Sequence, residues 1–260
     1  MWFFRVWGSR ESEAKPKSHP IRSLALNSLP GRVYGVIRRP RATFAAVIAA
    51  PAWAPVLIGT TLITFACSAG FLRTQVGQQA LVDQWERTAL AFGQTVDDAQ
   101  YSRMEQTAAS GRFDLVYAAA TTLASGPALA FGFAAFLYVI LNRTTRRRAS
   151  YAQVLAVVCY AGVILALRQV IATPVDYLRE SIASPTTLVQ FFTMLDEASP
   201  VARFLGVIDL FVVWWIVVLA IGISVLYERP TRRLALVFAS AYVALAFLAA
   251  LAMAVSGGTT

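Results

Sequence analysis

Residues 204–227 read FLGVIDLFVVWWIVVLAIGISVLY, an apolar run that contains a single charged side chain, Asp209. About 20 apolar residues are enough for a helix to cross the hydrocarbon core of a bilayer. The run therefore predicts a membrane-spanning helix with a carboxylate inside it. A carboxylate in hydrocarbon costs free energy unless it has a partner, so the surroundings of Asp209 become the central question about this chain.

The composition of the whole chain favours a membrane protein with several spans. Hydrophobic residues make up 57% of the 260 residues and charged residues only 14%, whereas soluble domains are about 25% charged. The net charge is +9. The basic residues cluster beside apolar stretches, which the positive-inside rule explains better than nucleic-acid binding does. We expect no nucleic-acid partner, and no small-molecule substrate is evident.

Five apolar stretches are long enough to cross a membrane. We expect an all-α fold, a polytopic helical bundle with five transmembrane helices plus short interfacial and extracytoplasmic helices. Residues 1–30, rich in Ser, Pro and basic side chains, are expected to form a flexible cytoplasmic tail because they cannot bury a core, and residues 256–260 a flexible C-terminus. Within a membrane domain of residues 31–255, the predicted spans are 53–72, 115–141, 154–173, 204–227 and 234–255.

Arginine is unevenly distributed among the segments that join the spans. The N-terminal tail, the loop 143–148 and the loop 229–233 are strongly basic, and the remaining segments are not. Because basic loops stay on the cytoplasmic side, we expect a cell-membrane protein with a cytoplasmic N-terminus and an extracytoplasmic C-terminus. The side chains expected to contact anionic lipids are Arg38, Arg39, Arg41, Arg146, Arg147 and Arg148.

Two segments outside the spans have helical patterns. In residues 31–55, Pro40 separates two short helices, the second capped by Thr43, which we expect to lie in the cytoplasmic interface. The arginines of this segment either bind headgroups or serve only to fix the topology, and the two interpretations are compatible.

The long loop 73–114 is predicted to be a helical hairpin. Leu81 and Trp85 share one helical face, and Thr95 with Asp98 has the spacing of a capping box that opens a second helix. This hairpin is the main surface outside the membrane. It either binds a partner or forms a lid packed on its own bundle.

Prolines indicate further breaks. Pro127 is expected to kink the span 115–141, and Pro174 lies in the loop that follows the next span. Pro185 is expected to begin another interfacial helix, which ends near Pro200.

Arg168 and Asp209 are charges within consecutive predicted spans. At about 1.5 Å per helical residue, both are expected roughly 6–8 Å below the outer boundary. An unpaired charge there costs on the order of 2.5–3.5 kcal/mol, so we expect an intramembrane charge pair between them. The pair is either a structural clasp between two helices or part of a gate or proton relay. Alternatively, Arg168 reaches the lipid headgroups by snorkelling.

The side chains that usually carry catalysis are sparse. His19 is the only histidine and belongs to the N-terminal tail, and Cys67 and Cys159 are expected near opposite ends of their spans. The sequence contains no glycine-rich phosphate loop, nucleophile elbow or metal-ligand cluster. We therefore expect no enzymatic activity, no metal site and no cofactor.

Three features together resemble the bacterial branch of the Yip-domain family. They are the five-span plan, RVYGVIRRPRATF at 32–44 followed by Pro51 and Trp53, and DLFVVW at 209–214 followed by Gly222. In eukaryotes, members of this family are membrane proteins that interact with Rab GTPases. The resemblance implies a five-helix integral membrane protein with a cytoplasmic N-terminus and a role in membrane organisation or trafficking. The short N-terminal region departs from the trafficking members and argues against Rab binding.

Two functions follow from these observations. The first is a non-enzymatic scaffold or partner-binding subunit, in contact with membrane lipids and with a protein partner or a second copy of itself. The alternative is a channel or transporter component with Arg168 and Asp209 at the permeation site. A third role, sensing or shaping of anionic membranes by residues 31–50, is compatible with the first.

Overall fold

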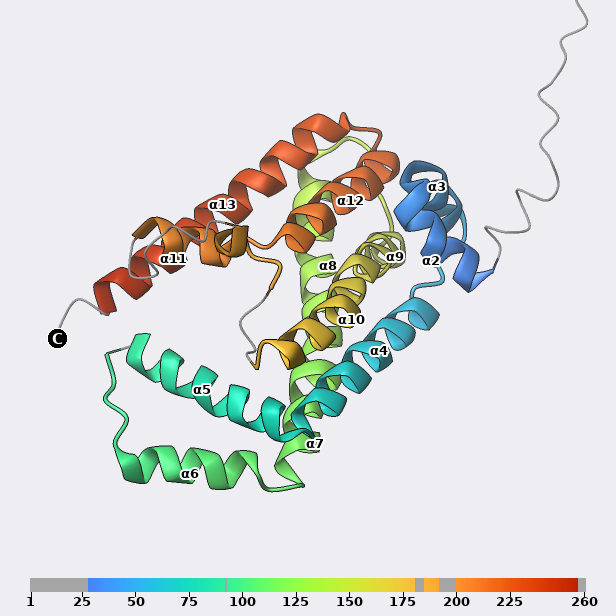
Figure 1. The fold of residues 1–260 in the computed structure, drawn as a ribbon. Helices are drawn as coiled ribbons and strands as arrows, with labels where there is room; N and C mark the ends of the chain where they lie inside the picture. The colour runs from blue at the N-terminus through green and yellow to red at the C-terminus, as the bar shows by residue number, and fades with distance from the viewer. Residues whose placement is uncertain (1–27, 92, 181–184, 192–199, 257–260) are drawn as a thin grey trace, which may run out of the picture.

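The computed structural model describes residues 28–91, 93–180, 185–191 and 200–256. Within these ranges the chain folds into helices and contains no strand, and a single antiparallel bridge joins Thr187 to Asp209. The predicted all-α architecture is confirmed (Figure 1). The flexible tail predicted for residues 1–30 lies outside the described part except for its last three residues, and the predicted flexible C-terminus except for Ser256.

Five helical segments are long and apolar enough to cross a membrane, as the sequence predicted. Two are joined from shorter helices, and two of the predicted boundaries move by several residues. The segments consist of α4 (Ala54–Leu72), α7–η1–α8 (Phe113–Ala118, Ala119–Ala124 and Ser125–Thr144), α9–α10 (Tyr151–Ala161 and Val163–Leu178), α12 (Leu210–Tyr227) and α13 (Thr231–Ser256).

The helix α9 lies at the centre of the bundle. All of its residues from Val154 to Ala161 are buried, and it packs against α3 (Pro40–Ala49), α8 and α12. Small and β-branched side chains dominate this stretch, so the neighbouring backbones can approach closely. Close van der Waals packing matters here because lipid tails are as apolar as the side chains, which leaves little hydrophobic driving force between helices.

The continuous span predicted for 204–227 is wrong. A short helix α11 (Pro200–Val207) ends before Ile208, and α12 begins at Leu210 with Asp209 as its N-cap. The Asp209 carboxylate accepts hydrogen bonds from backbone amides of the first turn of α12. A short acidic side chain that satisfies these amides favours a helix start over a helix interior, which is why the run divides here.

The third span also differs from the prediction. It divides at Gly162, where α9 ends and α10 begins, and α10 continues through Pro174 to Leu178 instead of ending at Thr173. Arg168 therefore lies well inside α10 rather than near its end. Proline removes one hydrogen bond from a helix, and membrane helices tolerate the loss more readily than exposed ones.

The second span contains a π-helical segment, η1, which ends three residues before Pro127. Proline has no amide hydrogen to donate to the carbonyl four residues earlier, and such sites accommodate wider turns. The hydroxyls of Thr121 and Thr122 donate to carbonyls of the preceding turn, at 2.7 Å to Tyr117 O and 2.5 Å to Ala118 O. The irregularity predicted at Pro127 thus takes the form of a π segment on its N-terminal side.

The two short helices predicted before the first span are present as α2 (Leu29–Arg38) and α3, with Pro40 at the start of α3. Thr43 does not cap α3, because its side chain is fully buried and its hydroxyl donates to Arg39 O at 3.1 Å. Val36, Phe44 and Val47 are also fully buried in the main core. The apolar faces of α2 and α3 therefore pack largely on protein, whereas we expected them to lie in the lipid interface.

The loop 73–114 forms a helical hairpin of α5 (Gln75–Ala91) and α6 (Asp98–Ala108), which lie side by side and antiparallel (Figure 1). The cap of α6 is Asp97, whose Oδ1 accepts from Gln100 N at 2.6 Å, so the predicted capping box of Thr95 and Asp98 is wrong. A carboxylate directly before the helix reaches the amides of its first turn, whereas Asp98 already lies within it.

The interfacial helix predicted to run from Pro185 to Pro200 is wrong in the part that the structure describes. Only a short 3-10 helix, η2 (Leu188–Phe191), forms there, and Pro200 begins α11 instead of ending a helix. Proline suits the first turn of a helix, whose amide has no intrahelical acceptor. Residues 192–199 lie outside the described ranges.

We expect replacement of Gly222 by alanine to destabilise the bundle. A Cβ at this position would lie 2.6 Å from Val157 Cγ1 and 3.1 Å from Phe44 Cδ1, so α3, α9 and α12 would have to move apart. Overpacking of this kind costs about 1–3 kcal/mol, and a lower melting temperature of the detergent-solubilised protein measures it. Gly132→Ala is the matched control, since a Cβ there meets no atom within 4 Å. Equal melting temperatures for the two variants would contradict the close contact.

Candidate functional site

The carboxylate of Asp209 is the most deeply buried charged group among the described residues, with 5% of the residue exposed. Its Oδ1 accepts hydrogen bonds from Phe211 N at 2.8 Å and from Val212 N at 3.4 Å. The first amides of a helix have no intrahelical acceptor, and the positive end of the helix dipole favours an anion beside them. Asp209 thus stabilises the start of α12 and is itself stabilised as a carboxylate.

The second oxygen of Asp209 faces α10 and the segment before η2. Oδ2 accepts from Arg168 Nε at 2.7 Å and from Thr186 Oγ1 at 2.6 Å. The Arg168 side chain is 29% exposed and that of Asp209 is 7% exposed, so most of the ion pair is buried within the protein. The structure therefore brings together the two charged residues that the sequence places within consecutive spans.

Backbone hydrogen bonds join further elements to the same point. Asp209 N donates to the hydroxyl of Tyr242 on α13 at 3.0 Å, and this hydroxyl donates to Val207 O at 2.9 Å. Leu210 N donates to Thr186 O at 3.0 Å, and Leu188 N donates to Ile208 O at 2.8 Å. Without these bonds, the break between α11 and α12 would leave backbone groups unsatisfied inside the membrane domain. Each unsatisfied group in hydrocarbon costs on the order of several kcal/mol.

Two members of this cluster were not recognised in the sequence. Tyr242 lies in an apolar run that predicts only a lipid-facing span, and Thr186 lies in a segment expected to be an interfacial helix. A tyrosine hydroxyl within a span needs a hydrogen-bond partner, which was the available signal for Tyr242. No pattern in the sequence indicates Thr186.

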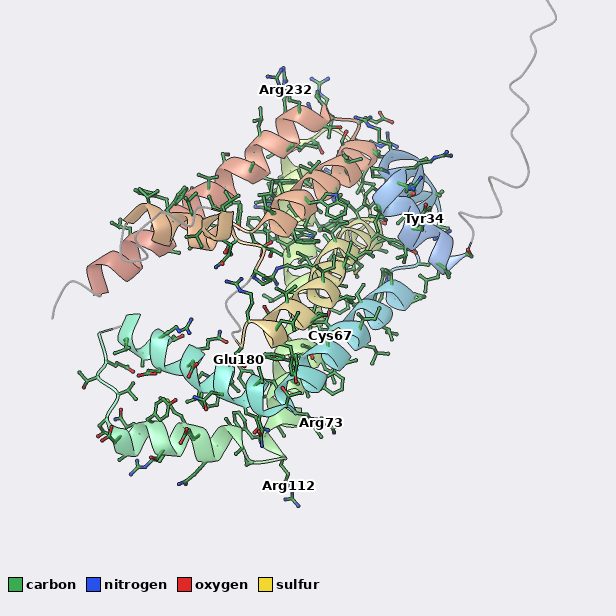
Figure 2. All side chains as sticks on the ribbon, in the orientation of Figure 1. Tyr34, Cys67, Arg73, Arg112, Glu180 and Arg232 are labelled. Carbon is green, nitrogen blue, oxygen red and sulfur yellow. The ribbon has the colours of Figure 1, made fainter. Side chains whose placement is uncertain are left out.

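The basic segments meet at one end of the bundle. Arg41 Nη2 donates to Thr231 Oγ1 at 2.7 Å, which links α3 to the start of α13. Arg147 forms an ion pair with Glu228, which links the loop between α8 and α9 to the turn between α12 and α13. Arg232 marks this end in Figure 2, and Arg112 lies at the opposite end. All six arginines predicted to contact lipid are exposed: Arg38, Arg39, Arg41, Arg146, Arg147 and Arg148.

The hairpin of α5 and α6 is attached to the opposite end of the bundle by its own small core. Leu72, Leu81 and Ala118 are buried there, and the Trp85 ring packs edge-on against Phe113 and Tyr117, with centroids 5.6 and 6.2 Å apart. The other side of α6 is solvent-exposed. The packing of its inner side on the bundle fits the lid interpretation, whereas binding of a partner to its outer side stays a prediction. The exposed outer side includes Asp98, Ser102, Glu105 and Gln106.

A polar cavity of about 190 Å³ lies between α4, α5, η1 and α10. Its lining includes Gln84, Thr121, Gln169 and Asp176. The Oδ1 atom of Asp176 is buried and accepts no hydrogen bond from a described residue. Buried polar atoms without a partner are rare and often mark a water, an ion or a functional group. Asp176 follows Pro174 in a segment expected to be a loop, so no pattern in the sequence indicated this cavity.

A family model of the Yip1 domain matches residues 34–253, which is most of the chain. The match spans all five apolar helical segments. Neither the curated proteins nor the solved structures include a match to this sequence.

We expect Arg168 and Asp209 to be energetically coupled. Asp209→Asn and Arg168→Gln should each lower the melting temperature, because each leaves a buried partner without its counter-charge. The double variant should be little worse than either single one, with a coupling of about 1–3 kcal/mol. Unfolding in mild detergent measures all three. Arg41→Gln combined with Asp209→Asn is the control and should be additive, since Arg41 bonds to Thr231 instead. Additive losses for Arg168 and Asp209 would show that the contact contributes nothing.

Proposed function

The chain belongs to the Yip1-domain family, and on that premise we propose that it is a non-enzymatic membrane scaffold or partner-binding subunit that acts in membrane organisation or trafficking. The chain is an integral membrane protein with several spans. The observation that carries it is the ordered helical hairpin of α5 and α6, which is attached to one end of the bundle and leaves the outer side of α6 exposed.

The geometry of the Asp209 cluster supports an architectural role for the intramembrane charges. Both carboxylate oxygens accept hydrogen bonds from protein groups, and only 5% of Asp209 is exposed. A gate or a proton relay needs a charge that water or a solute can reach. We therefore assign the pair of Arg168 and Asp209 to the clasp between α10 and α12, and place the contacts with partners on the surfaces outside the membrane.

The distribution of arginine supports an orientation. The exposed arginines of α2, α3 and the loop between α8 and α9 lie at the same end as Arg229, Arg232 and Arg233. By the positive-inside rule this end is cytoplasmic, where Arg38, Arg39, Arg41, Arg146, Arg147 and Arg148 contact anionic headgroups of the cell membrane. The hairpin of α5 and α6 then lies on the extracytoplasmic side.

The orientation predicts opposite results for reporters fused at two positions. Alkaline phosphatase fused after Thr260 should be active, and green fluorescent protein fused there should be dark. The same two reporters inserted in the loop 143–148, the matched control, should give the reverse. Fluorescence of a fusion at Thr260 would reverse the assignment of the two faces.

A second candidate function, a channel or transporter component, is favoured by the polar cavity next to Asp176. The lining of this cavity comes from α4, α5, α7, η1 and α10 and includes neither Arg168 nor Asp209. A permeation site here would therefore use Asp176 and Gln169 in place of Arg168 and Asp209. Solute flux into proteoliposomes of the full chain separates this function from the first.

If the chain is a scaffold, binding of its partner should require the outer side of α6. In a pull-down from native membranes in gentle detergent, the full chain should retain a stoichiometric partner or a second copy of itself. Ser102→Arg with Glu105→Arg should release it, because the two changes reverse the local charge without touching the core. Arg232→Glu, an equally exposed change at the opposite end, is the control and should leave the complex intact. Recovery of the monomer alone from the unaltered chain would refute the proposed scaffold.

A further inference from the structure

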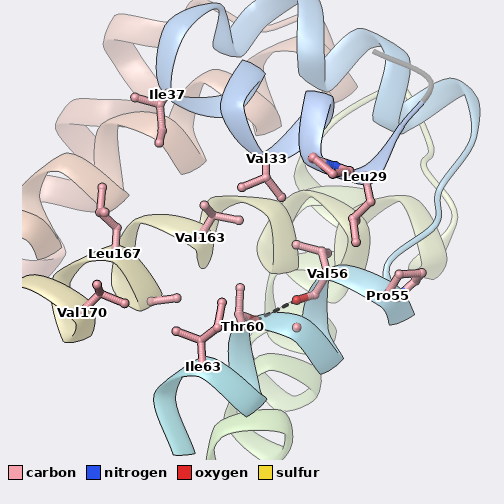
Figure 3. A pocket seen from close by; sticks show the side chains of 13 residues that line it. Leu29, Val33, Ile37, Pro55, Val56, Thr60, Ile63, Val163, Leu167 and Val170 are labelled. Carbon is pink, nitrogen blue, oxygen red and sulfur yellow. Dashed lines mark hydrogen bonds between the residues drawn. The ribbon is translucent and has the colours of Figure 1, made fainter. Parts of the chain in front are cut away.

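An apolar groove crosses the surface of the bundle between α2, α4 and α10 (Figure 3). It has a volume of about 380 Å³, within the range of pockets that hold small ligands. Val33 and Ile37 line it from α2, Val56 and Ile63 from α4, and Leu167 and Val170 from α10. Along α4 the groove extends from Pro55 to Ile63, which is about 12 Å of helix.

The lining of the groove presents no free hydrogen-bonding side chain. Its one hydroxyl, on Thr60, donates to Val56 O at 2.8 Å and to Leu57 O at 3.1 Å within its own helix (Figure 3). Carbonyl acceptors in the preceding turn thus satisfy this hydroxyl and leave only the Thr60 methyl for an occupant. A polar ligand would lose its hydration here without compensation, so the groove selects an apolar chain.

A cationic edge borders the groove on α2. Tyr34 follows Val33 and Arg38 follows Ile37, so both side chains stand about 100° further round the helix than the lining residues. Both are exposed, and the Arg38 guanidinium lies 5.6 Å from the centroid of the Tyr34 ring. Neither Arg38 nor Arg39 forms an ion pair with another residue in the described ranges. An elongated apolar groove with an exposed cation at its edge has the chemistry of a phospholipid site.

We propose that this groove holds one acyl chain of an anionic phospholipid whose phosphate is bound by Arg38. The groove lies beside the first two turns of α4, at the end of the bundle where the basic segments meet. The occupant is therefore a lipid of the basic-side leaflet. This inference deepens the proposed function, because it names the membrane component that the basic face recognises, and it rests on that function only for the assignment of this face to the cytoplasm.

The two parts of the site contribute differently. Hydrocarbon surrounds the bundle, so an acyl chain gains little hydrophobic free energy when it leaves the bulk lipid. The groove therefore retains the lipid by close packing, which slows its exchange with bulk lipid. Selectivity comes from the headgroup. A single arginine near an anionic headgroup is expected to favour it about fivefold over a zwitterionic one. Removal of the groove should therefore reduce retention of every phospholipid, and removal of Arg38 should reduce only the anionic preference.

The experiment uses the full chain in mild detergent, titrated with phosphatidylglycerol or phosphatidylcholine of identical acyl chains, with bound lipid counted by native mass spectrometry. Gly59 lines the groove, and a Cβ there meets no atom within 4 Å, so the side chain of Gly59→Phe can start into the groove without a backbone clash. Gly70→Phe is the control, because Gly70 is on the same helix and outside the groove, and a Cβ there likewise meets no atom within 4 Å. Melting temperatures verify that both variants fold.

The unaltered chain and Gly70→Phe should each retain one phosphatidylglycerol, about fivefold more than phosphatidylcholine. Gly59→Phe should retain neither lipid, and Arg38→Gln should bind the two lipids equally. Equal retention by Gly59→Phe and Gly70→Phe would overturn the proposal. So would a dimer of the unaltered chain that Gly59→Phe abolishes, because a second copy would then cover the groove. The pull-down that tests the outer side of α6 is carried out on the same proteins. If the unaltered chain retains the lipid but no partner, the scaffold is refuted and the lipid site is not.

Discussion

The hydrogen bonds of one carboxylate hold the C-terminal half of the bundle together. Asp209 caps α12 through Oδ1 and binds Arg168 of α10 and Thr186 through Oδ2. Its backbone amide bonds to Tyr242 of α13. A helix start inside a membrane domain exposes amides that hydrocarbon cannot satisfy, so the break before α12 exists only because these partners surround it. Arg168 in turn has a counter-charge at a depth where an isolated guanidinium is costly.

Close packing around a small residue holds α3, α9 and α12 together, in addition to the hydrogen bonds of Asp209. Gly222 of α12 lies against Val157 of α9 and Phe44 of α3, with no room for a Cβ. This contact draws α3 into the core, where Phe44 and Val47 are fully buried. The segment 32–44, whose arginines suggested a helix resting on the membrane surface, is therefore also a structural part of the bundle. Its charged side points outward while its apolar side packs on α9 and α12.

Hydropathy and charge in the sequence were sufficient to predict five spans, the division of the preceding segment at Pro40 and the contact between Arg168 and Asp209. They were insufficient for the breaks within spans. The division at Asp209, the π segment before Pro127 and the passage of α10 through Pro174 depend on tertiary partners that satisfy the backbone, and a window of apolar residues carries no information about those partners. Asp176 was missed for the same reason, since its place in α10 follows from a helix that continues past its proline.

The saturation of Asp209 constrains where function can reside. A permeating cation would have to compete with Arg168 for Oδ2 and with the amides of α12 for Oδ1. Each of these donors sits within hydrogen-bond distance already, and displacing a charge-assisted bond from a buried carboxylate costs more than a weakly held solute returns. We therefore propose that the pair of Arg168 and Asp209 stabilises one arrangement of helices and does not line a path through the bundle. In the described part of the chain, the places open to other molecules are the outer side of α6, the arginines at the opposite end, the apolar groove beside them and the cavity at Asp176.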